Sequence, residues 1–217
     1  MILGVAFDLD GTLIDNADIL TVALSRAIGD FGYRADPNEI RKYLGLSFAD
    51  IVSKFIERPD SDLLEKIKVA RRKYVLESIS AFKIFPDALY ALRALKELGV
   101  KSSVATSLGK DLVDPVIRGM KLDYYLCCWV TVDEVEKPKP EPDVFLKAMQ
   151  LMGLKPDSCI VVGDREYDVI AGKKAGSITA LVLRDSFSRY ESVKPDYTLR
   201  SLEELPDIIS SLNSKIG

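Results

Sequence analysis

Short apolar runs are spaced along the chain between longer segments in which apolar residues recur every three or four positions. The runs are rich in Val, Ile, Leu and Ala, and none alternates cleanly with polar residues. This pattern is typical of strands in a parallel sheet that is covered on both faces. The runs predict five buried strands and a short last one, at 2–7, 100–105, 125–130, 159–162, 178–183 and 197–199.

Helical patterns separate the later runs. Segments 87–98, 142–152 and 166–175 each carry an apolar face and are each followed by a glycine, a common end of a helix. A further helix is expected over 202–212. Alternating strands and helices of this kind predict an α/β fold with a doubly wound, mainly parallel sheet.

The stretch from about residue 16 to residue 82 contains no strand candidate. Its apolar stripes predict one helix capped by Asn16 and a longer helix that begins at Ser61. These stripes can be buried only against one another or against the sheet, so a small helical bundle inserted after the first strand is expected. We therefore predict an α/β core formed by 1–15 and 83–217 and a helical domain formed by 16–82.

Composition narrows the chemistry. The 217 residues include no histidine, which excludes Ser-His-Asp and Cys-His catalysis and histidine-ligated zinc. Acid–base chemistry must then come from carboxylates, lysines, a thiol or a metal-bound water. A net charge of −3 offers no basic field for nucleic acid. Without a basic leader, a spanning segment or a disulfide framework, we expect a cytoplasmic protein with no membrane partner.

Polar residues follow three of the predicted strands, where an open parallel sheet binds its ligands. Any one of them is explained as well by a turn or a helix cap. Several carboxylates at one sheet edge, however, repel one another unless a cation is present, and a hard divalent ion with oxygen ligands points to Mg²⁺. The residues concerned are Asp8, Asp10, Gly11, Thr12, Thr106, Ser107, Gly163, Asp164 and Asp168, with Lys137 and Lys139 in a nearby loop.

Four motifs, in order and with matching spacing, resemble those of the haloacid dehalogenase-like (HAD) hydrolases. The motifs are 7–13 (Phe-Asp-Leu-Asp-Gly-Thr-Leu), 105–107 (Ala-Thr-Ser), 139–145 (Lys-Pro-Glu-Pro-Asp-Val-Phe) and 162–168 (Val-Gly-Asp-Arg-Glu-Tyr-Asp). Any one motif is weak, but the set covers essentially the whole chain. The resemblance implies a Rossmann-like core with a helical cap, for which 16–82 is the candidate.

Two lysines begin a Lys-Pro-x-Pro string, Lys137 and Lys139. The family pattern continues with an acidic residue, an aliphatic residue and Phe, and then a helix that ends at a glycine fourteen residues after the lysine. Gly153 puts Lys139 in that register, so Lys137 is expected to be a neighbouring surface residue.

The resemblance implies a role for each matching residue. Asp8 would be the nucleophile, and Asp10 the general acid and then the general base. The implied phosphate-binding residues are Gly11, Thr12, Thr106, Ser107 and Lys139, helped by the main-chain N–H groups of Leu9 and Ser107. The implied Mg²⁺ ligands are Asp8, Asp164 and the main-chain carbonyl of Asp10, with Asp168 orienting Asp164 or a metal-bound water.

Within the family, Asp10 together with Asp164 favours phosphoryl transfer, because dehalogenating members carry another residue in place of Asp10 and need no metal. The pattern most resembles phosphoglycolate phosphatase-like members, which hydrolyse small phosphorylated metabolites through an aspartyl phosphate. Substrate choice is expected to depend on the cap loop 43–48, where Arg41 or Lys42 would meet a substrate carboxylate unless they are ordinary solvated charges.

Alternatives stay open at this point. Sugar phosphomutases of the family carry an Arg in the segment that matches 45–49, where this chain has Phe48 and Ala49, so that function is disfavoured. A phospho-accepting receiver-like signalling protein, or a silent binding protein, would share the acidic residues, but receivers lack a helical insertion after the first strand. The sequence does not decide between a monomer and a homodimer.

Overall fold

The computed structural model describes residues 1–185 and 187–215, so residue 186 and the last two residues of the predicted core segment 83–217 lie outside the described part. Within that part, six strands form one parallel sheet in the order β5-β4-β1-β6-β7-β8, which confirms the predicted α/β class. The strands are β1 Gly4–Phe7, β4 Lys101–Ala105, β5 Cys128–Val130, β6 Cys159–Gly163, β7 Ile178–Val182 and β8 Tyr197–Leu199.

Helices cover both faces of this sheet. Because successive strand residues point to opposite faces, Val5 and Phe7 pack in one cluster with α5 Pro86–Glu97, α6 Lys110–Gly119 and α9 Leu205–Ser214. Ala6, between them, packs in a second cluster with α7 Asp143–Met152 and α8 Glu166–Ala175. Strand β1 is therefore buried on both faces and paired on both edges.

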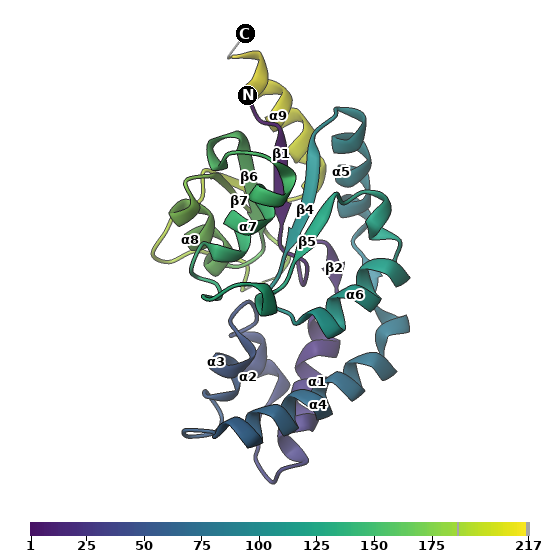
Figure 1. Cartoon of the computed structure of the whole chain (residues 1–217), viewed down its shortest axis with the longest axis vertical. Coiled ribbons are helices and arrows are strands. Elements are labelled where there is room, and N and C mark those ends of the chain that lie inside the picture. Colours follow the sequence, from purple (N-terminus) through teal and green to yellow (C-terminus); the bar gives the residue numbers. More distant parts are fainter. Residues whose placement is uncertain (186, 216–217) are drawn as a thin grey trace.

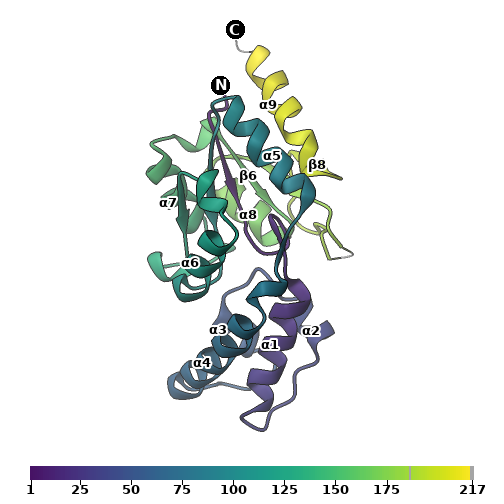
Figure 2. The same cartoon turned by 90° about the vertical axis from the view of Figure 1, so that its right-hand side faces the viewer.

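The remaining helices gather at one end of the molecule, opposite the two termini (Figures 1 and 2). They are α1 Ala17–Gly29, α2 Pro37–Arg41, α3 Phe48–Val52 and α4 Ser61–Glu77. A short antiparallel pair, β2 Ile14–Asp15 with β3 Lys83–Ile84, stands where the chain enters and leaves this segment. The four helices enclose an apolar cluster of their own, which includes Leu24, Ile28, Ile40 and Ile67.

Several local expectations differ from the structure. The predicted strand 125–130 begins only at Cys128, because residues just before it form a 3₁₀ turn. Helix α6 was not singled out by the sequence pattern, and Pro115 lies inside it. Asn16 precedes α1 but its side chain makes no capping hydrogen bond. The 3₁₀ turns are Ile79–Ala81, Leu122–Tyr124, Val132–Glu134, Pro156–Ser158 and Leu202–Glu204, the last forming the start of the helix expected over 202–212.

None of the helices in the described residues is both long enough and apolar enough to cross a membrane.

Candidate active site

The predicted site residues lie at the carboxyl edge of the sheet, which faces the four helices of the 16–82 segment (Figure 1). The chain first builds β4 and β5 on one side of β1 and later β6, β7 and β8 on the other. The carboxyl end of β1 is thus the point at which strand order switches, where open α/β sheets bind ligands. Asp8 follows β1 directly, Thr106 follows β4 and Asp164 follows β6.

Lys139 lies buried between two aspartates. Its Nζ is 2.6 Å from Asp8 Oδ1 and 2.8 Å from Asp168 Oδ1. The other oxygen of Asp168 accepts a hydrogen bond of 3.2 Å from the main-chain N–H of Arg165. Lys137, by contrast, is exposed. Asp168 therefore holds Lys139, a contact that sequence reasoning did not specify.

The charges in this cluster shift one another's ionisation. Burial raises the pKa of Asp8 well above its ordinary value, and nearby Asp168 and Asp164 raise it further, whereas Lys139 acts in the opposite direction. Burial alone would lower the pKa of Lys139, but Asp168 and Asp8 raise it. The ammonium thus stays charged, and its charge opposes the protonation of Asp8 that burial and the neighbouring carboxylates favour.

Asp164 completes the cluster and has an unsatisfied atom. Thr12 Oγ1 donates to Asp164 Oδ1 at 3.2 Å. Asp164 Oδ2 is buried and accepts no hydrogen bond from the described residues, although Arg165 Nε lies 3.1 Å away. Burial raises the pKa of Asp164 to about 7, although Arg165 acts to lower it.

The donor set fits a hard divalent cation. Asp8, Asp164 and Asp168 each offer a carboxylate oxygen, and these three oxygens lie within 4.8 Å of one another. Oxygen ligands, and a buried carboxylate oxygen that accepts no hydrogen bond from the described residues, match the preference of Mg²⁺. Gly11 is required beside this group, because it has a φ of +80° and a Cβ there would lie 2.6 Å from Asp164 Oδ2. The side chain of Asp10 is not part of the cluster.

Asp10 is held separately. Its Oδ1 accepts a 2.6 Å hydrogen bond from Asn16 Nδ2, and its Oδ2 accepts one of 3.3 Å from Thr106 Oγ1. Burial raises the pKa of Asp10, while the bonds from Asn16 and Thr106 and the charge of Arg71 lower it. Asn16, expected as a helix cap, instead donates its amide N–H to this carboxylate, and its Oδ1, the atom that would accept a capping bond, is buried without a hydrogen bond from the described residues.

A small cavity of about 40 Å³ opens over these groups and is lined by Asp8, Asp10 and Ser107 from the sheet edge. The loop 44–46 closes part of it, and Ser107 Oγ donates to the carbonyl of Gly45 at 2.8 Å. The other predicted phosphate-binding residues do not line this cavity. Gly11 and Thr12 adjoin Asp164, while Thr106 donates to Asp10 and Lys139 to Asp8.

The cap cations named from sequence are engaged elsewhere. Arg41 forms ion pairs with Asp18 and, through Nε at 3.2 Å, with Asp185. Lys42 pairs with Glu39 at 2.6 Å. The cation that does line the cavity is Arg71 of α4, which sequence reasoning did not single out. The sequence did contain a clue to the burial of Arg71, because this basic residue stands in the apolar stripe of the helix predicted from Ser61.

Comparison with known proteins agrees with this arrangement. The sequence profile of the haloacid dehalogenase-like hydrolases matches residues 5–182. A phosphoglycolate phosphatase of Aquifex aeolicus is 31% identical over 208 residues, which cover 95% of this chain and 96% of that protein. The pyrophosphatase PpaX of Bacillus cereus is 29% identical, with 96% and 97% covered.

A solved structure described as a predicted phosphatase from Clostridium acetobutylicum superposes with a TM-score of 0.85 at 25% identity, over 97% of this chain and 100% of that one. The match to the family profile spans most of the chain, and the first of these relatives aligns over nearly its whole length. The resemblance inferred from the four motifs is confirmed. The chain is an enzyme of the haloacid dehalogenase-like hydrolase family.

Proposed function

We propose that this enzyme is a Mg²⁺-dependent phosphatase that hydrolyses a small phosphomonoester through an aspartyl phosphate on Asp8. One observation carries the proposal: Asp8 belongs to the carboxylate cluster with Asp164 and Asp168, and it also lines the cavity. A carboxylate in that position can meet a bound phosphoryl group while its own charge is balanced by Lys139.

Each residue then has a chemical task. An oxygen of Asp8 attacks phosphorus, the bond from phosphorus to the leaving oxygen breaks, and Asp10 gives that oxygen a proton. Asp10 next takes a proton from water, which attacks the aspartyl phosphate and releases inorganic phosphate. Asn16 and Thr106 fix the Asp10 carboxylate for both transfers.

The metal assignment follows the chemistry of the cluster. Asp8 and Asp164, with the main-chain carbonyl of Asp10, would hold Mg²⁺. When bound, the ion supplies positive charge that offsets the negative charge of the phosphoryl group. Asp168 is not one of the proposed metal ligands; it accepts a hydrogen bond from Lys139 and so holds that side chain in place. Phosphoryl oxygens would be bound by Lys139, Thr106, Ser107 and the N–H groups of Leu9 and Ser107, with Gly11 and Thr12 shaping the loop around Asp164.

The substrate class is proposed from the relatives. The similar proteins are named phosphoglycolate phosphatase and pyrophosphatase, so a small phosphorylated metabolite is the proposed substrate. We propose that 16–82 acts as the cap domain over the core of 1–15 and 83–217, and that the enzyme works in the cytoplasm without nucleic-acid or membrane partners.

The test is the hydrolysis of a generic aryl phosphate with and without Mg²⁺, by the wild type and by Asp8→Asn. We expect fast, metal-dependent turnover that Asp8→Asn abolishes. A long-lived aspartyl phosphate with slow turnover would instead indicate a receiver-like protein, and no turnover in either form would indicate a binding protein. As a check that does not depend on activity, Mg²⁺ should raise the melting temperature of the wild type but not of Asp164→Asn.

A further inference from the structure

Arg71 is a buried cation that forms no ion pair with the described residues, although its guanidinium lies 5.7 Å from the centre of the Phe48 ring. It lies on the core-facing side of α4, one helical turn from both Ile67 and Val75, and its exposed fraction is 9%. Its Nε is buried without a hydrogen-bond partner among residues 1–185 and 187–215, and the ion pairs of that part of the chain do not include Arg71. The charges of Asp10 and Asp111 act on this guanidinium and oppose the lowering of its pKa by burial, but within the described residues neither carboxylate forms an ion pair with it. A buried guanidinium without a direct ion pair is destabilising, so it is free to bind an anion that enters the cavity.

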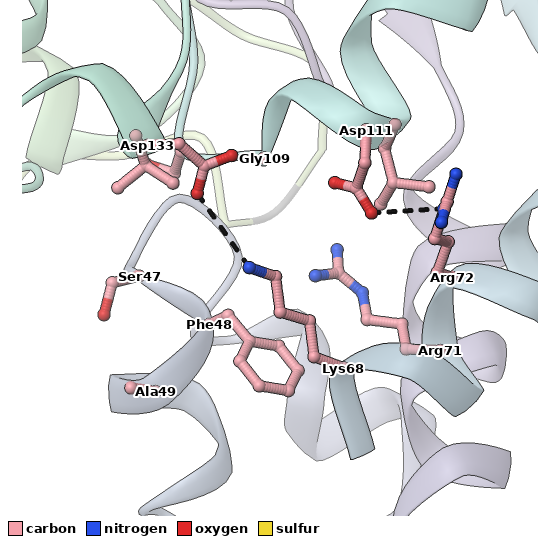
Figure 3. A pocket seen from close by; sticks show the side chains of 12 residues that line it. Ser47, Phe48, Ala49, Lys68, Arg71, Arg72, Gly109, Asp111 and Asp133 are labelled. Carbon is pink, nitrogen blue, oxygen red and sulfur yellow. Dashed lines mark ion pairs between the residues drawn. The ribbon is translucent and has the colours of Figure 1, made fainter. Parts of the chain in front are cut away.

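The guanidinium points into a second cavity, of about 200 Å³, that adjoins the first (Figure 3). The two cavities share Phe48, Arg71 and Ser107 as lining residues. A small molecule with its phosphoryl group at Asp8 would therefore extend past Arg71 into the second cavity. The leaving group is the part of the substrate that would occupy this space.

The other charges of the second cavity are matched in pairs. Arg72 Nε lies 3.3 Å from Asp111 Oδ2, and Lys68 Nζ lies 3.9 Å from Asp133 Oδ1. Asp133 also accepts a 2.8 Å hydrogen bond from the main-chain N–H at the start of α6. Figure 3 shows these two pairs on either side of Arg71, whose guanidinium points between them. The cavity thus carries one positive charge in excess, at Arg71.

We propose that Arg71 binds a second anionic group, a carboxylate or a phosphate, on the leaving group of the substrate. The proposal rests on the proposed phosphatase function and adds the requirement that the substrate carries two anionic ends. The planar guanidinium can bind either anion through two parallel hydrogen bonds. A leaving group without charge would leave Arg71 unpaired and would gain nothing from this residue.

The test compares two esters with the same two-carbon skeleton, 2-phosphoglycolate and ethyl phosphate, which differ by a carboxylate in place of a methyl group. The ratio of their kcat/KM values isolates the contribution of the second anion. Because a hydrogen bond to a charged group contributes more than a neutral one, Arg71→Gln should lower this ratio by about 10- to 100-fold. Arg71→Lys keeps the positive charge but loses the two parallel N–H donors of the guanidinium, so it should lower the ratio less than Arg71→Gln does.

Lys66→Gln serves as the matched control. Lys66 is on the same helix, is exposed and pairs with Asp62 at 2.6 Å, so the variant removes one positive charge from α4 outside either cavity. It should leave the ratio unchanged. Pyrophosphate as a third substrate distinguishes the two anions, because the wild type should prefer the substrate whose second group is the one that Arg71 binds.

Two results would overturn the proposal: a ratio unchanged in Arg71→Gln, or an equal loss on both esters, which would mean that Arg71 acts on the reacting groups through Asp10. Calorimetric binding of 3-phosphonopropionate, a non-hydrolysable analogue of phosphoglycolate, tests Arg71 without catalysis. If the wild type hydrolysed neither ester, the phosphatase function would fail. The inference about Arg71 would still be supported by weaker binding of this analogue to Arg71→Gln than to the wild type, and overturned by equal binding.

Discussion

Replacement of Lys139 by Met tests whether the buried ammonium holds the carboxylate cluster together. The methylene chain is retained, and only the charge that meets Asp8 at 2.6 Å and Asp168 at 2.8 Å is lost. At an effective dielectric constant of about 20, each contact corresponds to about 6 kcal/mol of Coulomb attraction. The cost of burying the ammonium offsets much of this, so the free energy of unfolding should fall by about 3–5 kcal/mol, the range for breaking a buried ion pair.

The measurement is urea unfolding of both forms near pH 8, with Lys137→Met as the control. Lys137 is exposed and stands two residues away in the same proline-rich loop, so its replacement should change stability by less than about 0.5 kcal/mol. The double variant Lys139→Met/Asp168→Asn should recover part of the loss, because it also removes one of the carboxylates left unpaired.

The loss of stability in Lys139→Met should also depend on pH, and it should be larger at high pH than at low pH. Lys139 lowers the pKa of Asp8, so in the variant Asp8 takes up a proton more readily. Protonation of Asp8 relieves the repulsion among the carboxylates. The difference in unfolding free energy between the wild type and Lys139→Met should therefore be smaller at about pH 5 than at about pH 8. This account of the cluster would be refuted if Lys139→Met lost no more stability than Lys137→Met, or if its loss of stability grew as the pH falls.

Three further predictions concern stability. Gly11→Ala and Gly32→Ala both place a side chain at a left-handed φ, of +80° and +82°, but only the first also meets a neighbouring carboxylate, so in urea unfolding Gly11→Ala should cost about 1–3 kcal/mol more. Arg71→Met should raise the unfolding midpoint, because it removes a buried unpaired charge, and a lowered midpoint would contradict the absence of an internal partner. Although burial raises the pKa of Asp87, its bond from Arg184 lowers it below the ordinary 3.8, so its stabilisation is full above about pH 4 and is lost at lower pH. The difference in urea midpoint between wild type and Asp87→Asn should therefore shrink from about pH 6 to about pH 3, and a constant difference would contradict the shift.

Sequence reasoning located the reactive edge because that edge depends on rules that act locally. An apolar run predicts a buried strand, and polar residues just after parallel strands must meet at one end of the sheet. Asp8, Thr106 and Asp164 were found in this way. Lys139 was preferred to its neighbour only by the resemblance, because the family's spacing between the lysine and the glycine after the helix fits Gly153.

The residues that were missed depend on contacts between distant elements. Asn16 stands where a capping residue is common, and nothing local shows that its amide nitrogen donates to the carboxylate of Asp10. Arg71 stands in register with Ile67 and Val75, so a helical stripe already predicted its burial. What the sequence could not show is that α4 packs over the cavity, which places this cation in the same cavity lining as Asp10 without an ion pair to it among the described residues.

The central place of β1 has a consequence for the order in which this protein can form during synthesis. Gly4 pairs with Lys101 on one side and with Cys159 on the other, so the first strand made must wait for two partners that leave the ribosome much later. The helices between 17 and 77 are complete well before either partner emerges. The carboxylate cluster of Asp8 with Asp164 therefore forms only after β6, the strand that precedes Asp164, has emerged.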